Sequence, residues 1–203
     1  MRDVKWLFFD IGSTLTDEAA AYARRVDETV RGTDVSREAF TEAMMQYFAE
    51  GKSGYAEAVR AFGLNKTPWH SEYEQPYPDC APTLKELFAR GYRLGVIANQ
   101  LPGTRERLMT WGLLPYFSVI AASAECGCAK PSPALFMWAL HTAGCAPEKA
   151  AMIGDRVDND ILPAKALGMK TVRVLTGPGA AFLPSPDPAD VTVSCLFDLL
   201  TLF

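Results

Sequence analysis

The chain has 203 residues, of which 49% are hydrophobic and 22% are charged. That length predicts one domain with a modest insertion, and the composition argues against an intrinsically disordered chain. The formal net charge of −4 points to neither nucleic acid nor an anionic membrane as a partner. No apolar run approaches the roughly 20 residues that span a bilayer. The 5 cysteines are odd in number and scattered, so we expect a cytoplasmic protein without a disulfide framework.

Short apolar runs recur along the chain, and they predict buried strands of a parallel sheet. These runs are residues 5–9, 93–97, 117–121, 150–153, 171–175 and 191–195. Helical patterns lie between them, at residues 83–90, 103–111, 133–142 and 159–167. Alternation of this kind predicts an α/β fold built on a doubly wound parallel sheet.

One stretch, residues 18–75, contains no convincing strand. Helical patterns fill it, and they begin at Ala19, Ser36 and Gly54. In the second pattern, aromatic and methionine side chains recur at helical spacing. We therefore expect residues 1–17 and 76–203 to form an α/β core and residues 18–75 to form a small all-helical cap. The alternative is a set of extra crossover helices packed on the sheet.

The residues that follow the predicted strands carry most of the chemistry. In an open α/β sheet, ligands bind beyond the carboxyl ends of the strands. The residues at these ends are residues 10–14, Ala98, Asn99, Lys130, Asp155, Asn159 and Asp160. Carboxylates from different strands repel one another unless a cation lies between them, and Mg²⁺ prefers oxygen ligands. A segment rich in glycine and proline, residues 177–188, is expected as an ordered loop at the rim of this site.

Four segments carry a resemblance to a known family. They are residues 8–15 (FFDIGSTL), 95–99 (GVIAN), 130–136 (KPSPALF) and 153–161 (IGDRVDNDI). In order and spacing they resemble the motifs of the haloacid dehalogenase superfamily, whose members are mostly Mg²⁺-dependent phosphatases. The resemblance covers nearly the whole chain. It implies a Rossmann-like core and identifies the helical insertion with the family's C1-type cap.

The resemblance also implies roles for the matching residues. Asp10 corresponds to the nucleophile, which attacks phosphorus and forms an aspartyl-phosphate. Lys130 corresponds to the lysine that offsets charge on the nucleophile and on the phosphoryl oxygens. Asp10, Asp155 and the main-chain carbonyl of Gly12 correspond to the ligands of Mg²⁺.

Further positions are expected to support the metal and the phosphate. Asp160 corresponds to the second acid of the last motif, at or near the metal, and Asn159 would hold it by hydrogen bonds. Ala98 and Asn99 stand at the family's phosphate-binding motif, where Asn99 would donate through its amide or its main-chain N–H. Thr14 supplies a further hydroxyl nearby.

Two positions depart from the family's pattern. In its phosphatases, an aspartate two residues after the nucleophile protonates the leaving oxygen and then activates water, but here that position is Gly12. Such a role is typically worth about 10²- to 10⁴-fold in rate. Ala98 stands where the family usually has a serine or threonine that binds the phosphoryl group. Three acidic residues could replace the missing acid, although each has the pattern of a surface or cap residue: Asp17, Glu18 and Asp158.

The sequence thus predicts a Mg²⁺-dependent phosphohydrolase that acts on a small phosphorylated metabolite, with activity weakened at Gly12 and Ala98. One alternative is a catalytically impaired member that binds metal and phosphate and serves a regulatory role. Another is chemistry similar to that of dehalogenases or phosphonatases, which also lack the second aspartate. The sequence predicts neither the substrate's identity nor the oligomeric state.

Overall fold

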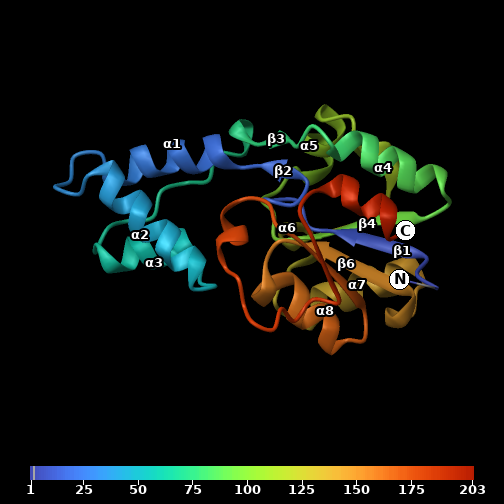
Figure 1. Cartoon of the computed structure of the whole chain (residues 1–203). Helices are drawn as coiled ribbons and strands as arrows, with labels where there is room; N and C mark the ends of the chain where they lie inside the picture. The colour runs from blue at the N-terminus through green and yellow to red at the C-terminus, as the bar shows by residue number, and fades with distance from the viewer. Residues whose placement is uncertain (2) are drawn as a thin grey trace.

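The computed structural model describes Met1 and residues 3–203. Its main sheet has 6 parallel strands in the order β5-β4-β1-β6-β7-β8 (Figure 1). The strands are β1 (Trp6–Phe9), β4 (Arg93–Ala98), β5 (Phe117–Ala122), β6 (Ala150–Gly154), β7 (Lys170–Val174) and β8 (Val191–Val193). Each predicted apolar run is therefore a strand, and the doubly wound parallel sheet is confirmed.

Helices cover both faces of this sheet, because side chains alternate along each strand. Leu7 and Phe9 of β1 pack on one face, whereas Trp6 and Phe8 pack on the other. The first face is covered by α4 (Cys80–Ala89) and α5 (Thr104–Thr110), and the second by α7 (Pro133–Ala143) and α8 (Leu162–Ala166). Burial of each large apolar side chain contributes about 1.5–3 kcal/mol, so β1 is the centre of the core.

The helix expected at residues 159–167 is divided in the structure. A π-helical turn, η4 (Val157–Ile161), is followed by the short helix α8. Pro163 explains the break, because it has no N–H to donate to the carbonyl of residue 159. The remaining short elements are the helix α6 (Ser123–Cys126) and the 3₁₀ turns η1 (Ser71–Tyr73), η2 (Leu114–Tyr116), η3 (Pro147–Lys149), η5 (Pro178–Ala181) and η6 (Leu196–Thr201).

Three helices lie apart from the sheet, on the left in Figure 1. They are α1 (Ala19–Val30), α2 (Arg37–Ala49) and α3 (Gly54–Ala61). They bury a cluster of their own, composed of Val26, Phe40, Met44, Phe48, Tyr55, Ala58 and Val59. This cluster explains the periodicity of the second helical pattern, because its aromatic and methionine side chains pack against α1 and α3 rather than against the sheet.

A short antiparallel ribbon connects these helices to the core. Its strands are β2 (Thr16–Asp17) and β3 (Gln75–Pro76), and Thr16 pairs with Pro76 while Asp17 pairs with Gln75. The two points where the chain passes between the core and the helices are therefore held together. Two-residue strands are too short for a periodic pattern, so sequence analysis does not find them.

Among the residues described, no helix is both long enough and apolar enough to cross a bilayer. All 5 cysteines are free thiols: Cys80, Cys126, Cys128, Cys145 and Cys195. The expectation that they form no disulfide framework agrees with this arrangement.

Replacement of Phe40 by alanine should selectively weaken the helical cluster. Phe40 is fully buried, and its ring centroid lies 5.9 Å from that of Tyr55 and 5.8 Å from that of Phe62. We expect Phe40→Ala to lower the free energy of unfolding by about 3–5 kcal/mol in urea denaturation. Met45→Ala, on the exposed side of the same helix, is the control and should cost about 0.5 kcal/mol or less. Equal losses in the two variants would contradict the assignment of this cluster.

Candidate active site

Three neighbouring strands end at residues with polar side chains. β1 lies between β4 and β6, and Asp10, Asn99 and Asp155 directly follow these strands. Because parallel strands end at the same edge of the sheet, the side chains meet there. Carboxylate oxygens of Asp10, Asp155 and Asp160 all lie within 4.8 Å of one another. The structure therefore brings together three acidic residues that the sequence analysis selected.

The side chain of Lys130 joins two of these carboxylates and is only 2% exposed. Its Nζ lies 2.8 Å from Asp10 Oδ1 and 2.6 Å from Asp160 Oδ1. Burial alone would lower the pKa of Lys130, but the attraction of the two carboxylates outweighs burial and raises that pKa. Lys130 is consequently a fixed positive charge beside Asp10.

Asn99 holds Lys130 in place through the main chain. Asn99 Nδ2 donates to the carbonyl oxygen of Lys130 at 2.9 Å, and the Lys130 main-chain N–H donates to Asn99 Oδ1 at 2.7 Å. The amide oxygen and one N–H of Nδ2 are engaged, so the second N–H of Nδ2 and the main-chain N–H of Asn99 are the donors left for the phosphate contact that the sequence predicts. Ala98 is fully buried at the end of β4 and offers only main-chain atoms.

Hydrogen bonds orient the other two carboxylates. Thr14 Oγ1 donates to Asp155 Oδ1 at 3.2 Å, which places the Thr14 hydroxyl beside the carboxylates. Asp160 Oδ2 accepts from the main-chain N–H of Arg156 at 3.0 Å. The sequence predicts that Asn159 holds Asp160. In the structure, the hydrogen bonds to Asp160 come instead from the main-chain N–H of Arg156 and from Lys130 Nζ. Asn159 instead lines the cavity in front of the carboxylates.

The acidic cluster carries more negative charge than Lys130 balances. Burial, together with repulsion from Asp160 and Asp10, raises the pKa of Asp155 well above its usual range. Burial also raises the pKa of Asp160, although the attraction of Lys130 opposes this shift. Both shifts have the same physical cause, since buried carboxylates this close destabilise each other's charged form.

The segment after β7 lies over the carboxylates, as expected for the loop at residues 177–188. Arg173, which the sequence analysis missed, anchors it. Arg173 is 1% exposed and donates to the carbonyl oxygens of Asp155 at 3.2 Å and Gly179 at 2.9 Å. Gly179 lies so close that a Cβ there would be 2.6 Å from Asp155 Oδ2. The available signal was an arginine within an apolar strand, because a buried arginine requires partners.

Asp10 and Asp155 line a cavity of about 140 Å³ between the sheet edge and the helices. Asp10 and Lys130 contribute from the core, and Tyr22 and Phe48 contribute from α1 and α2. A second hollow of about 480 Å³ adjoins it. The residues that line both are Glu18, Tyr22, Asn99 and Gln100.

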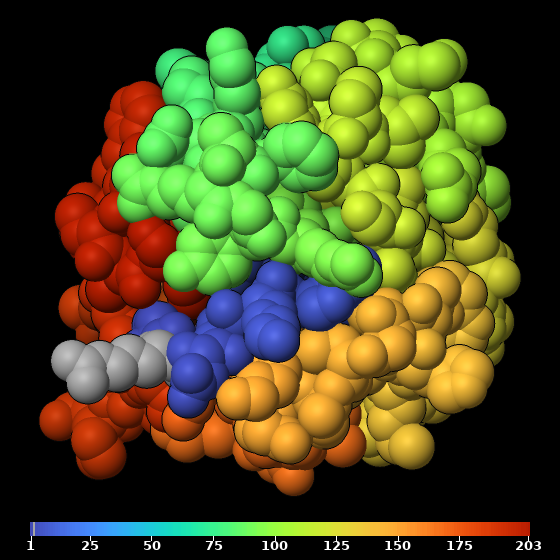
Figure 2. Space-filling model, turned by 90° about the vertical axis from the view of Figure 1, so that its right-hand side faces the viewer, coloured from blue at the N-terminus to red at the C-terminus, as the bar shows by residue number. Residues whose placement is uncertain are grey.

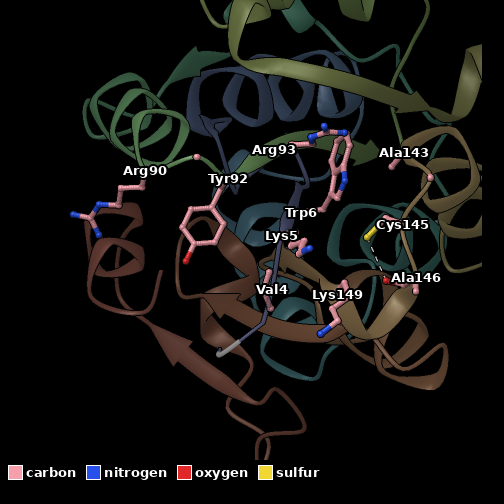
Figure 3. Close-up of a pocket in the computed structure, with 12 residues that line it drawn as sticks. Val4, Lys5, Trp6, Arg90, Tyr92, Arg93, Ala143, Cys145, Ala146 and Lys149 are labelled. Atoms are coloured by element: carbon pink, nitrogen blue, oxygen red, sulfur yellow. Dashed lines mark hydrogen bonds between the residues drawn. The ribbon is translucent and has the colours of Figure 1, made fainter.

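A larger hollow of about 720 Å³ lies at the opposite edge of the sheet, where the strands begin (Figure 3). Figure 2 shows this face, with the N-terminal residues in blue between a green and an orange segment. Lys5, Arg93 and Lys149 line the hollow, and among the described residues no carboxylate does. Arg90 is engaged elsewhere, because it donates to the carbonyl oxygen of Leu200. Size alone therefore does not identify the reacting centre.

Of the three acidic residues considered as replacements for the missing acid, two are engaged outside the cavity. Asp17 is exposed and accepts a hydrogen bond from the main-chain N–H of Ala19 at 2.8 Å, which caps α1. Asp158 pairs with Arg156, with 2.6 Å between Oδ2 and Nη2. The third, Glu18, lines the cavity.

Glu18 has an environment that favours its protonated form. Ser13 Oγ donates to Glu18 Oε2 at 2.7 Å. Burial raises the pKa of Glu18 to about 8, while the bond from Ser13 acts in the opposite direction. The carboxyl group lies next to Gly12, two residues after Asp10.

A doubly wound parallel sheet with an acidic cluster and a lysine at its carboxyl edge is the site architecture of a class of hydrolases with a Rossmann-like core. The sequence profile of the haloacid dehalogenase-like hydrolases matches residues 4–168. The chain is 31% identical over 198 residues to the glyceraldehyde 3-phosphate phosphatase of Methanopyrus kandleri, covering 86% of this chain and 85% of that protein. It is 29% identical over 185 residues to the phosphoglycolate phosphatase of Aquifex aeolicus, covering 84% of each.

Comparison with solved structures shows the same fold. A predicted phosphoglycolate phosphatase from Haemophilus somnus superposes with a TM-score of 0.79 at 20% identity, over 100% of this chain and 99% of that one. The chain belongs to the haloacid dehalogenase-like hydrolases. It is a hydrolase of the phosphatase type.

Removal of Lys130 should destabilise the protein in the presence of EDTA. Lys130→Met leaves Asp10 and Asp160 without their cation, and we expect a loss of about 3–5 kcal/mol in the free energy of unfolding. Lys149→Met is the control, because Lys149 Nζ lies 4.0 Å from Asp3 Oδ2 at the surface and should contribute about 1 kcal/mol or less. Adding Asp160→Asn to Lys130→Met should recover part of the loss. Equal stability of the two lysine variants in urea would contradict the role of the buried pair.

Proposed function

We propose that the protein is a Mg²⁺-dependent phosphohydrolase that cleaves a small phosphorylated metabolite through an aspartyl-phosphate on Asp10. The observation that carries this proposal is the position of Asp10, which shares one cavity with Lys130 and Asp155. Positioning and charge neutralisation account for most of the catalysis of phosphoryl transfer. A carboxylate nucleophile next to a fixed positive charge supplies both.

The donor set fits a hard divalent cation. Its three acidic members offer only oxygen atoms, and these lie within 4.8 Å of one another. The three carboxylates carry more negative charge than Lys130 balances. A cation bound between them would reduce their mutual repulsion. We propose Asp10, Asp155 and the main-chain carbonyl of Gly12 as ligands, with Asp160 close by. When bound, the cation offsets negative charge on the phosphoryl oxygens.

The residues of the chain have separate tasks in the proposed reaction. An oxygen of Asp10 attacks phosphorus, and the bond to the substrate's ester oxygen breaks. Lys130 holds Asp10 Oδ1 at 2.8 Å and so orients the nucleophile while it attracts the phosphoryl oxygens. Asn99 keeps that lysine in position through its two bonds to the main chain. Water then hydrolyses the aspartyl-phosphate.

We propose that residues 1–17 and 76–203 form the catalytic core and that residues 18–75 form a cap that selects the substrate. The separate buried cluster of the three helices supports this division. The hollow beside the carboxylates also receives Tyr22 and Arg25 from α1, so the cap faces any group attached to the phosphate. The adjoining hollow has a volume of about 480 Å³, and the relatives are named as phosphatases of glyceraldehyde 3-phosphate and phosphoglycolate. Both observations favour a small phosphorylated metabolite as the substrate.

Gly12 and Ala98 favour a second candidate, a member that binds metal and phosphate but turns over little. Neither residue has a side chain that could donate to the substrate. Turnover measurements separate this binding protein from an enzyme, because both would bind phosphate with the same residues.

Replacement of the nucleophile should abolish turnover without unfolding the protein. With Mg²⁺ and p-nitrophenyl phosphate, we expect Asp10→Asn to lower kcat/KM by at least about 10³-fold, because an amide does not form the acyl phosphate. Asp34→Asn, an exposed aspartate between α1 and α2, should retain wild-type activity. Activity that persists in Asp10→Asn, with folding checked by circular dichroism, would refute the proposed nucleophile.

Magnesium should stabilise the folded protein through Asp155. At 100 times its Kd, a cation that binds only the folded state adds about 2.7 kcal/mol, or roughly 5–10 °C in Tm for a domain of this size. We expect Asp155→Asn to lose most of this response in thermal unfolding, whereas Asp34→Asn keeps it. If EDTA and Mg²⁺ give the same Tm for the wild type, the proposed metal dependence is wrong.

A further inference from the structure

The carboxyl group of Glu18 fills the space beside Gly12. A Cβ built on Gly12 would overlap Glu18 Oε1 and would lie 3.0 Å from Glu18 Cδ and 3.2 Å from Glu18 Oε2. Because protein interiors are closely packed, a side chain at position 12 would have to displace this carboxyl. Glu18 thus occupies the volume in which a side chain two residues after Asp10 would begin.

Local contacts keep Glu18 directed toward that space rather than onto its own helix. Glu18 is the N-cap residue of α1, yet its side chain makes no capping bond to the helix. Asp17 performs that task by accepting from the Ala19 N–H. The Glu18 carboxyl instead accepts from Ser13 Oγ at 2.7 Å. One oxygen is therefore held by the core, and the other faces Gly12.

Glu18 lies where the two cavities of the site meet. Asp10 and Lys130 line the 140 Å³ cavity, whereas the adjoining 480 Å³ hollow is lined by α1 and by the loop after β4. A substrate whose phosphoryl group lies at Asp10 would have room for the rest of the molecule in the larger hollow. Its ester oxygen would then lie at the boundary, which Glu18 lines.

Among the described residues, no lysine, arginine or histidine forms an ion pair with this carboxyl. Asp10 is paired with Lys130, and Asp155 lines the first cavity but not the adjoining hollow. The charges that act on Glu18 are acidic, and they belong to Glu74, Asp10 and Asp17. Glu18 is thus the carboxyl at the boundary that remains available to the substrate.

The other residues at the boundary are weaker proton donors. Asn99 and Gln100 carry amides, which do not act as acids. Tyr22 packs edge-on against Trp69, with 4.9 Å between ring centroids, and burial raises the pKa of its phenol. A raised pKa makes that phenol less able to give a proton to an alkoxide.

We propose that Glu18 is the general acid and general base of this hydrolysis, a role that rests on the function proposed above. As an oxygen of Asp10 bonds to phosphorus, the bond from phosphorus to the ester oxygen breaks, and that oxygen takes the proton of the Glu18 carboxyl. The resulting carboxylate takes a proton from water, whose oxygen bonds to phosphorus while the bond to Asp10 breaks. Phosphate leaves, and Asp10 and protonated Glu18 are restored.

The leaving-group dependence of Glu18→Gln tests this role, because glutamine keeps the size of the side chain but has no acidic proton. With phenyl phosphate, whose leaving group needs a proton, kcat/KM should fall by about 10²- to 10⁴-fold. With 2,4-dinitrophenyl phosphate, whose leaving group does not, it should fall by less than about tenfold. Rapid-quench experiments on that substrate should show accumulated phosphoenzyme, since the base is also missing. Glu42→Gln, exposed on α2, is the matched control and should behave as the wild type.

A relocated carboxyl gives a second test. Glu18→Ala vacates the space beside Gly12, so adding Gly12→Asp should recover at least about tenfold of the lost activity on phenyl phosphate. Gly12→Asp alone should not raise activity, because its side chain meets Glu18. Recovery in the double variant supports the proposal, and its absence overturns it if thermal unfolding shows both variants folded.

The remaining outcomes separate this inference from the proposed function. If Asp10→Asn is inactive while Glu18→Gln matches Glu42→Gln on both substrates, the general-acid role is overturned and the phosphohydrolase remains. A selective loss on phenyl phosphate in Tyr22→Phe, instead of Glu18→Gln, also overturns it. If the wild type shows no hydrolysis that depends on Asp10, both proposals are wrong.

Discussion

The contact between a buried lysine and two carboxylates sets the conditions for the rest of the site. Burial of charged groups is costly unless each has partners, and Lys130 is at once the partner of Asp10 and of Asp160. The Asn99 amide fixes the lysine's main chain, and the Arg156 N–H fixes Asp160. The negative charge that remains on the three carboxylates is suited to a cation, not to an anionic phosphate.

Much of this arrangement could be predicted from the sequence, because it depends on which residues follow buried strands. Asp10, Asn99 and Asp155 each stand directly after an apolar run, and parallel strands bring such residues to one edge. The order of the strands is not contained in the local pattern, and only the structure shows it. The helices α1, α2 and α3 were also recognisable, since their apolar residues recur at helical spacing.

Other features depend on contacts between segments distant in the chain, and no local pattern reports these. From the sequence, Asn159 is expected to hold Asp160, but the hydrogen bonds to Asp160 come from the Arg156 N–H and Lys130. Arg173 has no local signal of its partners, which are the main-chain carbonyls of Asp155 and of the loop that covers it. The choice among three acidic residues also depends on the tertiary structure, which alone shows that Glu18 points toward Gly12.

The antiparallel ribbon of β2 and β3 has a mechanical consequence. The ribbon is the axis about which the helices would turn relative to the sheet, and Glu18 directly follows its first strand. A point near an axis moves through a shorter arc than a point far from it. A rotation wide enough to carry Phe48 on α2 away from the sheet edge would therefore displace the Glu18 carboxyl much less. Such a rotation would therefore change the surroundings of Asp10 less on the side of the ribbon than on the side of α2.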